Sequence, residues 1–278
     1  MIRKKSTLLI LYLIATLVAL IFLAPFVWII FTSLKPSKEV FSYPITLFPR
    51  SITLEHYEYV IFKMSDFRRY FWNSTIITGV SLAIIAISSS LGGYALGRKN
   101  FWGKNWFIAF ILLVLAIPYS VYLIPIFIME TRLGIKNSYL ALILPYVALN
   151  LPWGLFIMMG TFRGVPSEIE DAARIDGCSE YQLWSKIMLP LAKPGLATTI
   201  IITFIFIWQE FIYAVTLQTD ARWKTLPVGI VHIRDELQSL AYDNLSVAII
   251  LSLLPLFIVF VALKDFFIKG IVEGGLKG

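Results

Sequence analysis

The residues best suited to chemistry are polar groups that interrupt long apolar runs. Asn150, Gln209 and Glu210 are such groups, and the tryptophans Trp153 and Trp208 lie near them in the chain. Inside a membrane, an ionisable group usually faces a cavity or a partner. The alternative is that Glu210 is an interfacial residue that ends a hydrophobic core. We interpret the five residues as the possible lining of a pathway.

The motifs of common catalytic sites are missing. No G-x-x-x-x-G-K-[ST] phosphate loop occurs, because the nearest candidate, Gly97–Asn105, has one residue too many between its glycines and ends in asparagine. Neither H-E-x-x-H nor G-x-S-x-G is present. Cys178 is the single cysteine, and His56 and His232 lie far apart, so we interpret the histidines as solvated. We expect no catalytic residue, no bound metal and no nucleotide hydrolysis by this chain.

The composition indicates a membrane protein. The 278 residues are 58% hydrophobic and 15% charged, with a mean hydropathy of +0.79, whereas soluble domains are about 45–50% apolar and about 25% charged. The net charge of +7 does not indicate a nucleic-acid partner, because the basic residues are spread over loops without a basic, aromatic-rich stripe. The expected environment is therefore a lipid bilayer.

Six apolar runs approach or exceed the roughly 20 residues that cross a bilayer. The predicted spans are residues 8–31, 72–97, 106–128, 139–160, 195–216 and 245–263. The N-terminal Arg-Lys-Lys cluster places that end in the cytoplasm, and six spans return the C-terminus there. Loop 163–193 is then cytoplasmic, and loops 32–70 and 217–244 are external. The expected fold is all-α and polytopic, in a single domain over 1–278.

Prolines and small residues inside these runs predict bent helices in close contact. Pro118 and Pro125 lie in the third run, and Pro145 and Pro152 lie in the fourth. Proline kinks are tolerated in lipid when neighbouring helices satisfy the freed backbone groups. Small side chains in the second run permit close helix approach, at Gly92, Gly93, Ala95 and Gly97.

The stretch Val165–Gly195 is dense in charge and has the pattern of two short helices. Four signals mark the helix ends: a Ser167/Glu170 capping box, an Asp176-Gly177 turn, a Ser179/Gln182 capping box and a Leu189-Pro190 stop. Helices of two or three turns are marginal without a packing surface. That surface is either the chain's own membrane helices or a partner protein, and the pattern alone favours neither.

Part of this stretch, Ile169–Pro190, resembles the EAA loop of the permease subunits of ABC importers. The family pattern is E-A-A, three residues, glycine, an aromatic residue and I-x-L-P. The matching residues are Asp171-Ala172-Ala173 for E-A-A, Asp176-Gly177 for the turn, Trp184 for the usual phenylalanine, and Ile187, Leu189 and Pro190 for the end. Aspartate for glutamate keeps the charge but shortens its reach, and Cys178 replaces a usual alanine.

Three further stretches resemble the carbohydrate permeases of the maltose/trehalose type, specifically the shorter six-helix partner. These are Phe71-Trp72-Asn73-Ser74, Trp208-Gln209-Glu210-Phe211 in place of W-N-E-F, and Gly274-Gly275-Leu276-Lys277-Gly278 in place of G-A-V-K-G. Glutamine for asparagine at 209 lengthens the amide. The resemblance covers nearly the whole chain and implies the type I ABC importer permease fold.

The resemblance implies a machine of several subunits in the cell inner membrane. Such a permease works with a second homologous permease, a dimer of ATPase subunits and an extracytoplasmic sugar-binding protein. The ATPase would bind ATP and Mg²⁺, so this chain itself would be no enzyme. The implied function is the import of an oligosaccharide such as maltose or trehalose along a pathway between the two permeases.

The resemblance also implies roles for individual residues. Those that would couple to the ATPase are Asp171, Ala172, Ala173, Asp176, Gly177, Trp184, Ile187, Leu189 and Pro190. Those of the tail that would reach the ATPase interface are Gly274, Gly275, Leu276, Lys277 and Gly278. Arg222, Trp223 and Lys224 would face the binding protein.

Two alternatives belong to other classes. One is a permease of the same superfamily for a polyamine, phosphate or an amino acid. The other is a secondary transporter or channel that works alone. This second alternative predicts inverted repeats and carboxylates at membrane depth. The sequence shows no inverted repeat, and Glu210 is its one candidate for such a carboxylate.

Overall fold

A computed structural model of the chain describes residues 5–40, 42–236 and 242–275. The described residues form helices, turns and connecting segments, with no strand among them, as expected for an all-α protein. Contacts divide the described residues into two compact units, and the single domain over 1–278 stays a prediction. Unit 1 takes the described residues of Met1–Arg68 and Gly229–Leu254, and unit 2 those of Arg69–Val228 and Pro255–Gly278.

Unit 1 begins with a long apolar helix. Helix α1 (Lys5–Ser33) is apolar around its whole circumference, and most of its described side chains are exposed. Short helices α2 (Ser37–Val40) and α3 (Glu55–Glu58) and the π-helical turn η1 (Tyr59–Lys63) follow. A helix that is hydrophobic all round is suited to lipid or to the interior of a larger assembly.

One histidine of unit 1 departs from the expectation of a solvated ring. His56 is only 8% exposed. Its Nε2 lies 3.1 Å from the carbonyl oxygen of Lys35 and 3.6 Å from the carboxylate of Asp243. Ser37 donates a hydrogen bond to the same carboxylate. The prediction was wrong because these partners come from distant parts of the sequence.

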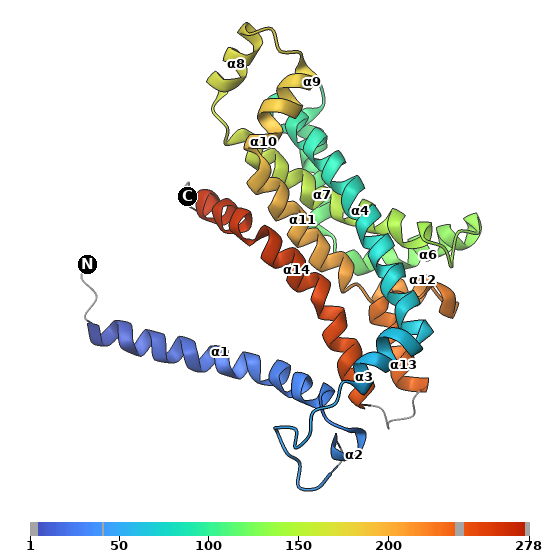
Figure 1. Cartoon of the computed structure of the whole chain (residues 1–278). Helices are drawn as coiled ribbons and strands as arrows, with labels where there is room; N and C mark the ends of the chain where they lie inside the picture. The colour runs from blue at the N-terminus through green and yellow to red at the C-terminus, as the bar shows by residue number, and fades with distance from the viewer. Residues whose placement is uncertain (1–4, 41, 237–241, 276–278) are drawn as a thin grey trace. The chain divides into compact units, whose positions relative to one another are not determined.

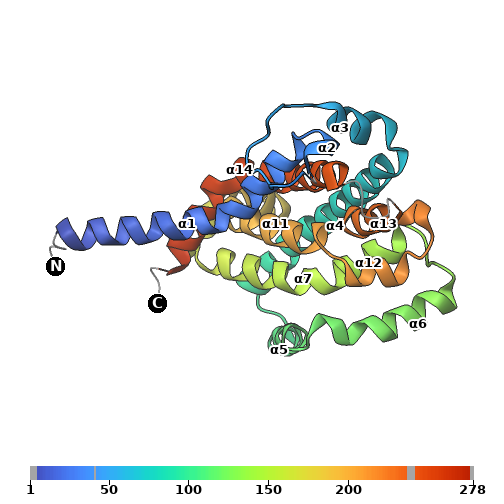
Figure 2. The same cartoon turned by 90° about the horizontal axis from the view of Figure 1, so that it is seen from below.

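Unit 2 is organised around three helices that run side by side (Figures 1 and 2): α4 (Ser65–Arg98, in unit 2 from Arg69), α7 (Leu140–Arg163) and α11 (Lys193–Trp208). The predicted close approach of small residues is present between α4 and α7. A Cβ atom on Gly93 would lie 2.4 Å from the Cβ of Met158, so only glycine fits at this contact.

The third predicted span is not one continuous helix. Helix α5 (Lys104–Ala116) and helix α6 (Leu123–Leu133) are joined by the 3₁₀ turn η2 (Tyr119–Tyr122), and the two halves meet at 93°. Pro118 causes the break, because it lacks an N–H and holds Ile117 in an extended conformation with ψ of 126°. Pro125 lies in the first turn of α6, where a missing N–H costs little.

The last two predicted spans also differ from the structure. The run 195–216 divides into α11, which ends at Trp208, and α12 (Ile212–Leu217). The 3₁₀ turn η4 (Ala221–Trp223) and helix α13 (Leu226–Glu236) follow. Helix α14 (Tyr242–Gly275) extends well beyond the predicted 245–263. In the described residues, four helices are long and apolar enough to span a membrane, or up to six if each of two bent pairs is one span.

Candidate functional site

The first candidate site is the α8–α10 element, residues 167–191, which contains the predicted turn. Helix α8 (Ser167–Ile175) is followed by Asp176 and by Gly177, whose φ is 82°. The N–H of Cys178 donates to the carbonyl of Ala173 at 3.0 Å, and the N–H of Gly177 donates to that of Arg174 at 3.1 Å. This pair of bonds is a Schellman motif, which needs a residue that tolerates positive φ.

The second half of the element begins at the predicted capping box and continues past the predicted stop at Leu189-Pro190. Ser179 and Gln182 form a reciprocal capping box for α9 (Glu180–Gln182), with bonds of 2.9 and 3.3 Å. The π-helical segment η3 (Leu183–Met188) and α10 (Leu189–Leu191) continue the helix. Pro190 therefore does not end it. The chain instead turns by 73° at the junction with α11.

The predicted capping box at Ser167 is absent, because Glu170 binds arginines instead. No side chain caps the start of α8. The Glu170 carboxylate is almost fully buried and pairs with the guanidinium of Arg98 and with Nη2 of Arg174, the latter at 3.0 Å. Arg98 also donates from Nη1 to the carbonyl of Val165 at 3.0 Å. Sequence reasoning missed this pair, since 72 positions separate Arg98 from Glu170.

A second ion pair joins the end of α4 to α9. Lys99 donates a hydrogen bond to the Glu180 carboxylate at 2.5 Å, and the Tyr94 hydroxyl donates to it at 3.3 Å. Arg174 approaches the other oxygen of the same carboxylate at 3.4 Å. The hydrogen bond from Lys99 lowers the pKa of Glu180, so this network is charged at neutral pH.

The inner face of the α8–α10 element packs on the chain's own helices. Ala173, Leu183 and Met188 are buried against Tyr94 of α4 and against α7, where Met158 and Phe162 complete the cluster. Trp184 and Ile187 are half-buried at its edge. The interpretation of a loop folded on its own helices therefore holds for this face.

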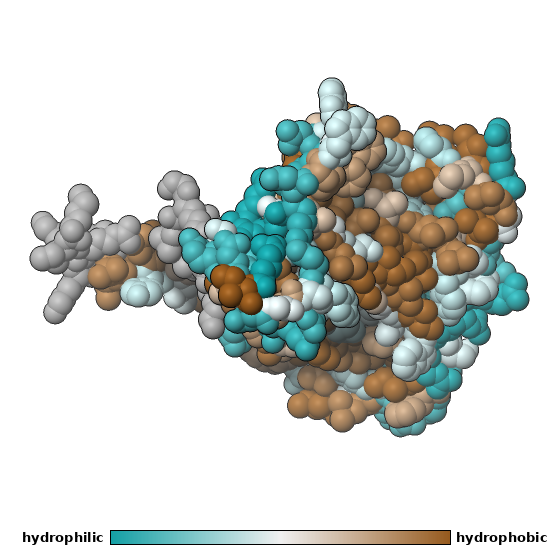
Figure 3. Space-filling model, turned by 90° about the horizontal axis from the view of Figure 1, so that it is seen from above, coloured by the Kyte–Doolittle hydropathy of each residue, from teal (hydrophilic) through white to brown (hydrophobic). Residues whose placement is uncertain are grey.

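The outer face of the element remains open. Ile175 is 86% exposed and Tyr181 is 71% exposed. Figure 3 looks onto this end of unit 2, where hydrophilic residues gather over α8 and α9 and hydrophobic residues surface among them. An open groove of about 410 Å³ lies on this element, lined by Glu168, Ile169, Ala172, Ala173, Asp176, Cys178 and Ile187. The predicted coupling residues that are also exposed are Asp171, Ala172, Asp176, Gly177 and Pro190.

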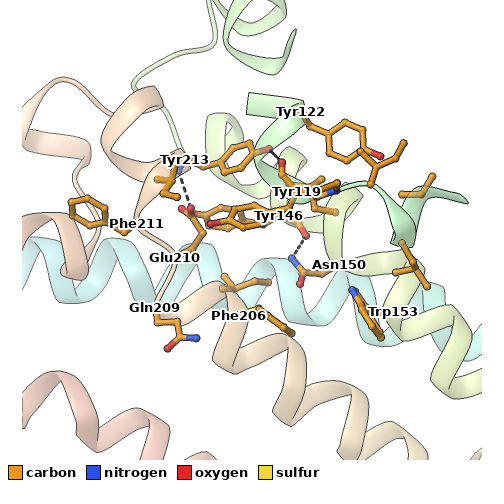
Figure 4. Close-up of a pocket in the computed structure, with 17 residues that line it drawn as sticks. Tyr119, Tyr122, Tyr146, Asn150, Trp153, Phe206, Gln209, Glu210, Phe211 and Tyr213 are labelled. Atoms are coloured by element: carbon orange, nitrogen blue, oxygen red, sulfur yellow. Dashed lines mark hydrogen bonds between the residues drawn. The ribbon is translucent and has the colours of Figure 1, made fainter. Parts of the chain in front are cut away.

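The second candidate site is a cavity of about 610 Å³ within unit 2. It lies where the break between α5 and η2 meets the break between α11 and α12, next to α7 (Figure 4). Tyrosines form much of its wall, and the residues that line it include Tyr119, Tyr122, Tyr146, Asn150, Trp153, Phe206, Gln209, Glu210, Phe211 and Tyr213. Two helix breaks thus meet at this cavity.

Glu210 is held in place by three donors. Its Oε1 accepts from the backbone N–H of Tyr213 at 2.8 Å, and its Oε2 accepts from that of Ala214 at 3.1 Å. The Tyr146 hydroxyl donates to Oε2 at 2.6 Å. The carboxylate therefore caps α12 and braces it against α7. The Tyr213 hydroxyl in turn donates to the carbonyl of Tyr119 at 2.7 Å, which joins α12 to η2.

Four of the five residues interpreted as pathway lining lie at this cavity, and Trp208 does not. Asn150 donates to the carbonyl of Tyr146 at 2.8 Å, and Trp153 lies further along the wall (Figure 4). Gln209 is exposed, and its side chain extends away from Glu210. Trp208 is buried and stacks on Phe204, with ring centroids 5.5 Å apart.

At the other end of α4, the loop 217–226 is fixed by neutral side chains. We call it the anchored loop. Asn73 donates from Nδ2 to the carbonyls of Arg222 and Lys224 at 3.0 and 2.9 Å, and its Oδ1 accepts from the Tyr139 hydroxyl at 3.1 Å. Ser74 accepts from the N–H of Leu226 at 2.8 Å. The F-W-N-S stretch contributed to the family resemblance, but no role was predicted for its residues.

The three residues expected to face a binding protein lie on the anchored loop. Arg222 pairs with Asp220 at 2.7 Å, and this hydrogen bond lowers the pKa of Asp220 to about 2. Trp223 meets the Tyr139 ring edge-on, with centroids 5.0 Å apart, and Lys224 is half-exposed.

Only two residues of the predicted tail are among the described residues, and its contact with the ATPase stays a prediction. Gly274 and Gly275 belong to α14, whereas Leu276, Lys277 and Gly278 lie outside the described residues. Within the part of the chain that the structure describes, no group of three or more His, Cys, Asp or Glu side chains is arranged to hold a metal ion.

Comparison with known proteins decides the family. Residues 89–273 match the family described as "Binding-protein-dependent transport system inner membrane component". The chain belongs to this family. The permease is 34% identical to the sulfoquinovosyl glycerol transport system permease protein SmoH of Agrobacterium fabrum, over 92% of this chain and 89% of that protein. It is also 34% identical to the trehalose/maltose transport system permease protein MalG of Thermococcus litoralis, over 95% of each chain.

A solved structure shares the fold of the permease. A chain of a bacterial ABC transporter involved in the import of the acidic polysaccharide alginate matches with a TM-score of 0.82 and 23% identity, over 96% of this chain and 99% of that one. The resemblance to ABC importer permeases, and the all-α membrane fold that it implied, are therefore confirmed. The permease is an inner membrane component.

Proposed function

We propose that the permease imports an oligosaccharide such as maltose or trehalose, together with a second homologous permease that completes the pathway. The relatives named above are permeases for sulfoquinovosyl glycerol and for trehalose or maltose. The observation that best supports a sugar is the cavity around Glu210, because aromatic rings and amides suit a hydroxyl-rich ligand. A permease for a polyamine, phosphate or an amino acid is the alternative.

We propose that the α8–α10 element couples this pathway to an ATPase dimer. Its inner face is packed on α4 and α7, and its outer face offers exposed Ile175, Tyr181 and an acidic-rimmed groove. ATP-driven closure of the ATPase dimer would move the element, and the ion pairs from Arg98 and Lys99 would carry this motion to α4. The EAA-loop residues Asp171–Pro190 would make the contact.

The motor lies outside this chain in this proposal. The sequence has no phosphate loop, so ATP and Mg²⁺ would be bound by the partner ATPase. The tail Gly274–Gly278 would reach the ATPase interface, with both termini in the cytoplasm. The anchored loop would then face an extracytoplasmic sugar-binding protein with Arg222, Trp223 and Lys224.

Reconstitution tests the proposal. The permease is co-expressed with its second permease, ATPase and binding protein, and the purified complex is placed in proteoliposomes. We expect ATP-dependent uptake of labelled maltose or trehalose, with no uptake of spermidine, phosphate or an amino acid. Uptake of a non-sugar solute alone would show that the substrate class is wrong. Uptake that persists without the ATPase subunit would show that the permease is a secondary transporter.

A further inference from the structure

We propose that the cavity around Glu210 is itself a sugar subsite, and that it accepts uncharged sugars and rejects acidic ones. This inference rests on the proposed function, because it concerns the pathway for the same substrate. It goes further in placing binding on this chain and in assigning charge selectivity to one residue. The first support is the size of the cavity, about 610 Å³, which falls within the range of about 300–1,000 Å³ usual for small-molecule sites.

The wall of the cavity offers what a sugar ring requires. The wall includes the aromatic rings of Tyr122 and Trp153, and that of Tyr119, which stacks on Tyr213. Aromatic rings of this kind can pack against the C–H groups of a pyranose. Asn150 uses its amide nitrogen on the Tyr146 carbonyl, and its amide oxygen makes no hydrogen bond within the described residues. Gln209 adds an exposed amide with both a donor and an acceptor. Apolar rings and neutral polar groups therefore line one chamber.

The charge of the wall is negative. Among the described residues that line the cavity, Glu210 is the only charged side chain, and none is a lysine, arginine or histidine. Three donors converge on the oxygens of the Glu210 carboxyl group, and two of them are backbone N–H groups. Because these bonds also cap α12, the carboxylate cannot rotate away from an incoming ligand. A ligand in this chamber therefore meets a fixed negative charge without a neutralising cation.

Hydrogen-bond capacity explains why an uncharged sugar is favoured. A carboxylate has about four acceptor positions, and the protein donors fill three of those of Glu210. One position remains for a sugar hydroxyl, which is a donor. A uronate group brings only acceptors and a second negative charge close to the Glu210 carboxylate, and like charges repel. The same residue thus attracts one class of sugar and repels the other.

The comparison with the alginate importer shows what the fold leaves open. That importer carries an acidic polysaccharide, and it shares the fold of the permease at a TM-score of 0.82. A shared fold therefore does not determine the charge of the cargo. The side chains of the cavity must do so if this chain contributes to selection, and here they favour a neutral cargo.

Direct binding to the complex without its binding protein tests the inference, because the binding protein would otherwise filter the sugars. Equilibrium dialysis of the purified permease–ATPase complex gives the dissociation constants of labelled maltose, trehalose and digalacturonate. We expect the neutral sugars to bind at least about tenfold more tightly. Glu210→Gln keeps the shape of the side chain and an oxygen that accepts at the start of α12. This variant should reduce the ratio of the affinity for maltose to the affinity for digalacturonate. Gln209→Arg should narrow it further by adding a cation.

The outcomes separate the two proposals. Equal binding of digalacturonate and maltose to the wild type, or an unchanged ratio in both variants, overturns the charge-selective subsite. If the proteoliposomes import maltose while Asn150→Ala and Trp153→Ala leave maltose binding unchanged, the subsite is wrong and the proposed function stands. If no sugar is bound or imported and a non-sugar solute is imported, both fail. Thermal melting of each variant complex shows that the variants are folded.

Discussion

The two ends of α4 hold their neighbouring segments by different chemistry. At Arg98 and Lys99, the α8–α10 element is held by ion pairs to Glu170 and Glu180. At Asn73, the anchored loop is held by uncharged hydrogen bonds, and these bonds go to main-chain groups. One end thus uses charge between side chains, and the other uses amide geometry on the backbone.

The difference fits the tasks that we propose for the two ends. Arg174 contacts three carboxylates, those of Glu170, Asp171 and Glu180, so it can exchange partners while the element moves. Hydrogen bonds from one amide to two carbonyls permit only one loop conformation. A coupling element must shift and remain attached, whereas a docking loop gains affinity by being preformed.

Breaking the buried ion pair should have the largest effect. Glu170→Ala leaves the guanidinium of Arg98 nearly buried, since the two side chains are 13% and 4% exposed. Loss of one partner of a buried pair costs about 3–5 kcal/mol. We expect a large fall in the melting temperature of the complex and loss of uptake. Thermal unfolding of the purified complex measures the first effect, and vesicle uptake measures the second.

The matched control is the exposed pair of the same network. Lys99 and Glu180 are 34% and 58% exposed, and exposed pairs contribute about 0–1 kcal/mol. Glu180→Ala should therefore change the melting temperature little. The exchanged pair, Arg98→Glu with Glu170→Arg, should recover part of the loss. Equal effects of Glu170→Ala and Glu180→Ala would contradict the assignment of Glu170 as the main attachment.

Strain in the turn at Gly177 should have the next largest effect. It should reduce the coupling of ATP hydrolysis to uptake and leave assembly of the complex intact. Gly177→Val places a β-branched residue at a φ of 82°, at a cost of about 1–3 kcal/mol. We expect ATP hydrolysis to continue while uptake per ATP falls, because the turn would no longer present α8 to the ATPase. The ratio of uptake to hydrolysis measures this.

Gly134 provides the control for the turn, because it has a φ of 68° and lies outside the α8–α10 element. Neither glycine has an atom within 4 Å of an added Cβ, so both variants suffer backbone strain without a clash. Gly134→Val should lower stability and leave the ratio of uptake to hydrolysis unchanged. The same fall in this ratio for both variants would assign the effect to general destabilisation.

Local features of these regions were predictable from sequence, and contacts between distant segments were not. The Asp176-Gly177 turn and the Ser179/Gln182 capping box depend on residues within a few positions of each other. Glu170 was assigned to a cap because Ser167 lies three residues before it, and its stronger partner, Arg98, was invisible at a separation of 72. Electrostatic pairing in a buried site outweighs a local cap.

The cavity illustrates the same limit. Pro118 predicted a bent helix, but only the packed structure shows a 93° break opposite a second break at Glu210. Gln209 and Glu210 interrupt the apolar run 195–216 in the sequence, but the predicted span continued through them, whereas α11 ends at Trp208. The carboxylate of Glu210 explains that stop, because it takes over the capping of a new helix.

Removing the amide of Asn73 should have a moderate effect at the opposite end of α4. Asn73→Asp keeps an acceptor for Tyr139 and removes both donors to the loop carbonyls. Each unsatisfied carbonyl costs about 1–3 kcal/mol. We expect faster hydrogen–deuterium exchange in residues 220–226 and weaker stimulation of ATP hydrolysis by the binding protein. Thr75→Ala, which removes a bond within α4 only, should change neither.

The smallest effect is expected for the exposed pair on the anchored loop. Arg222→Ala removes the partner that lowers the pKa of Asp220 from its ordinary 3.8 to about 2. A carboxylate with a lowered pKa stabilises the fold above its unfolded pKa, and it loses this contribution as the pH falls from about 4 to about 2. Melting at pH 7 should barely change, because the Arg222 side chain is 75% exposed.

The same variant tests the proposed contact with the binding protein. If Arg222 faces that protein, Arg222→Ala should lower the salt dependence of binding-protein association while the melting curve stays the same. An unchanged salt dependence would leave the anchored loop without its proposed electrostatic contact.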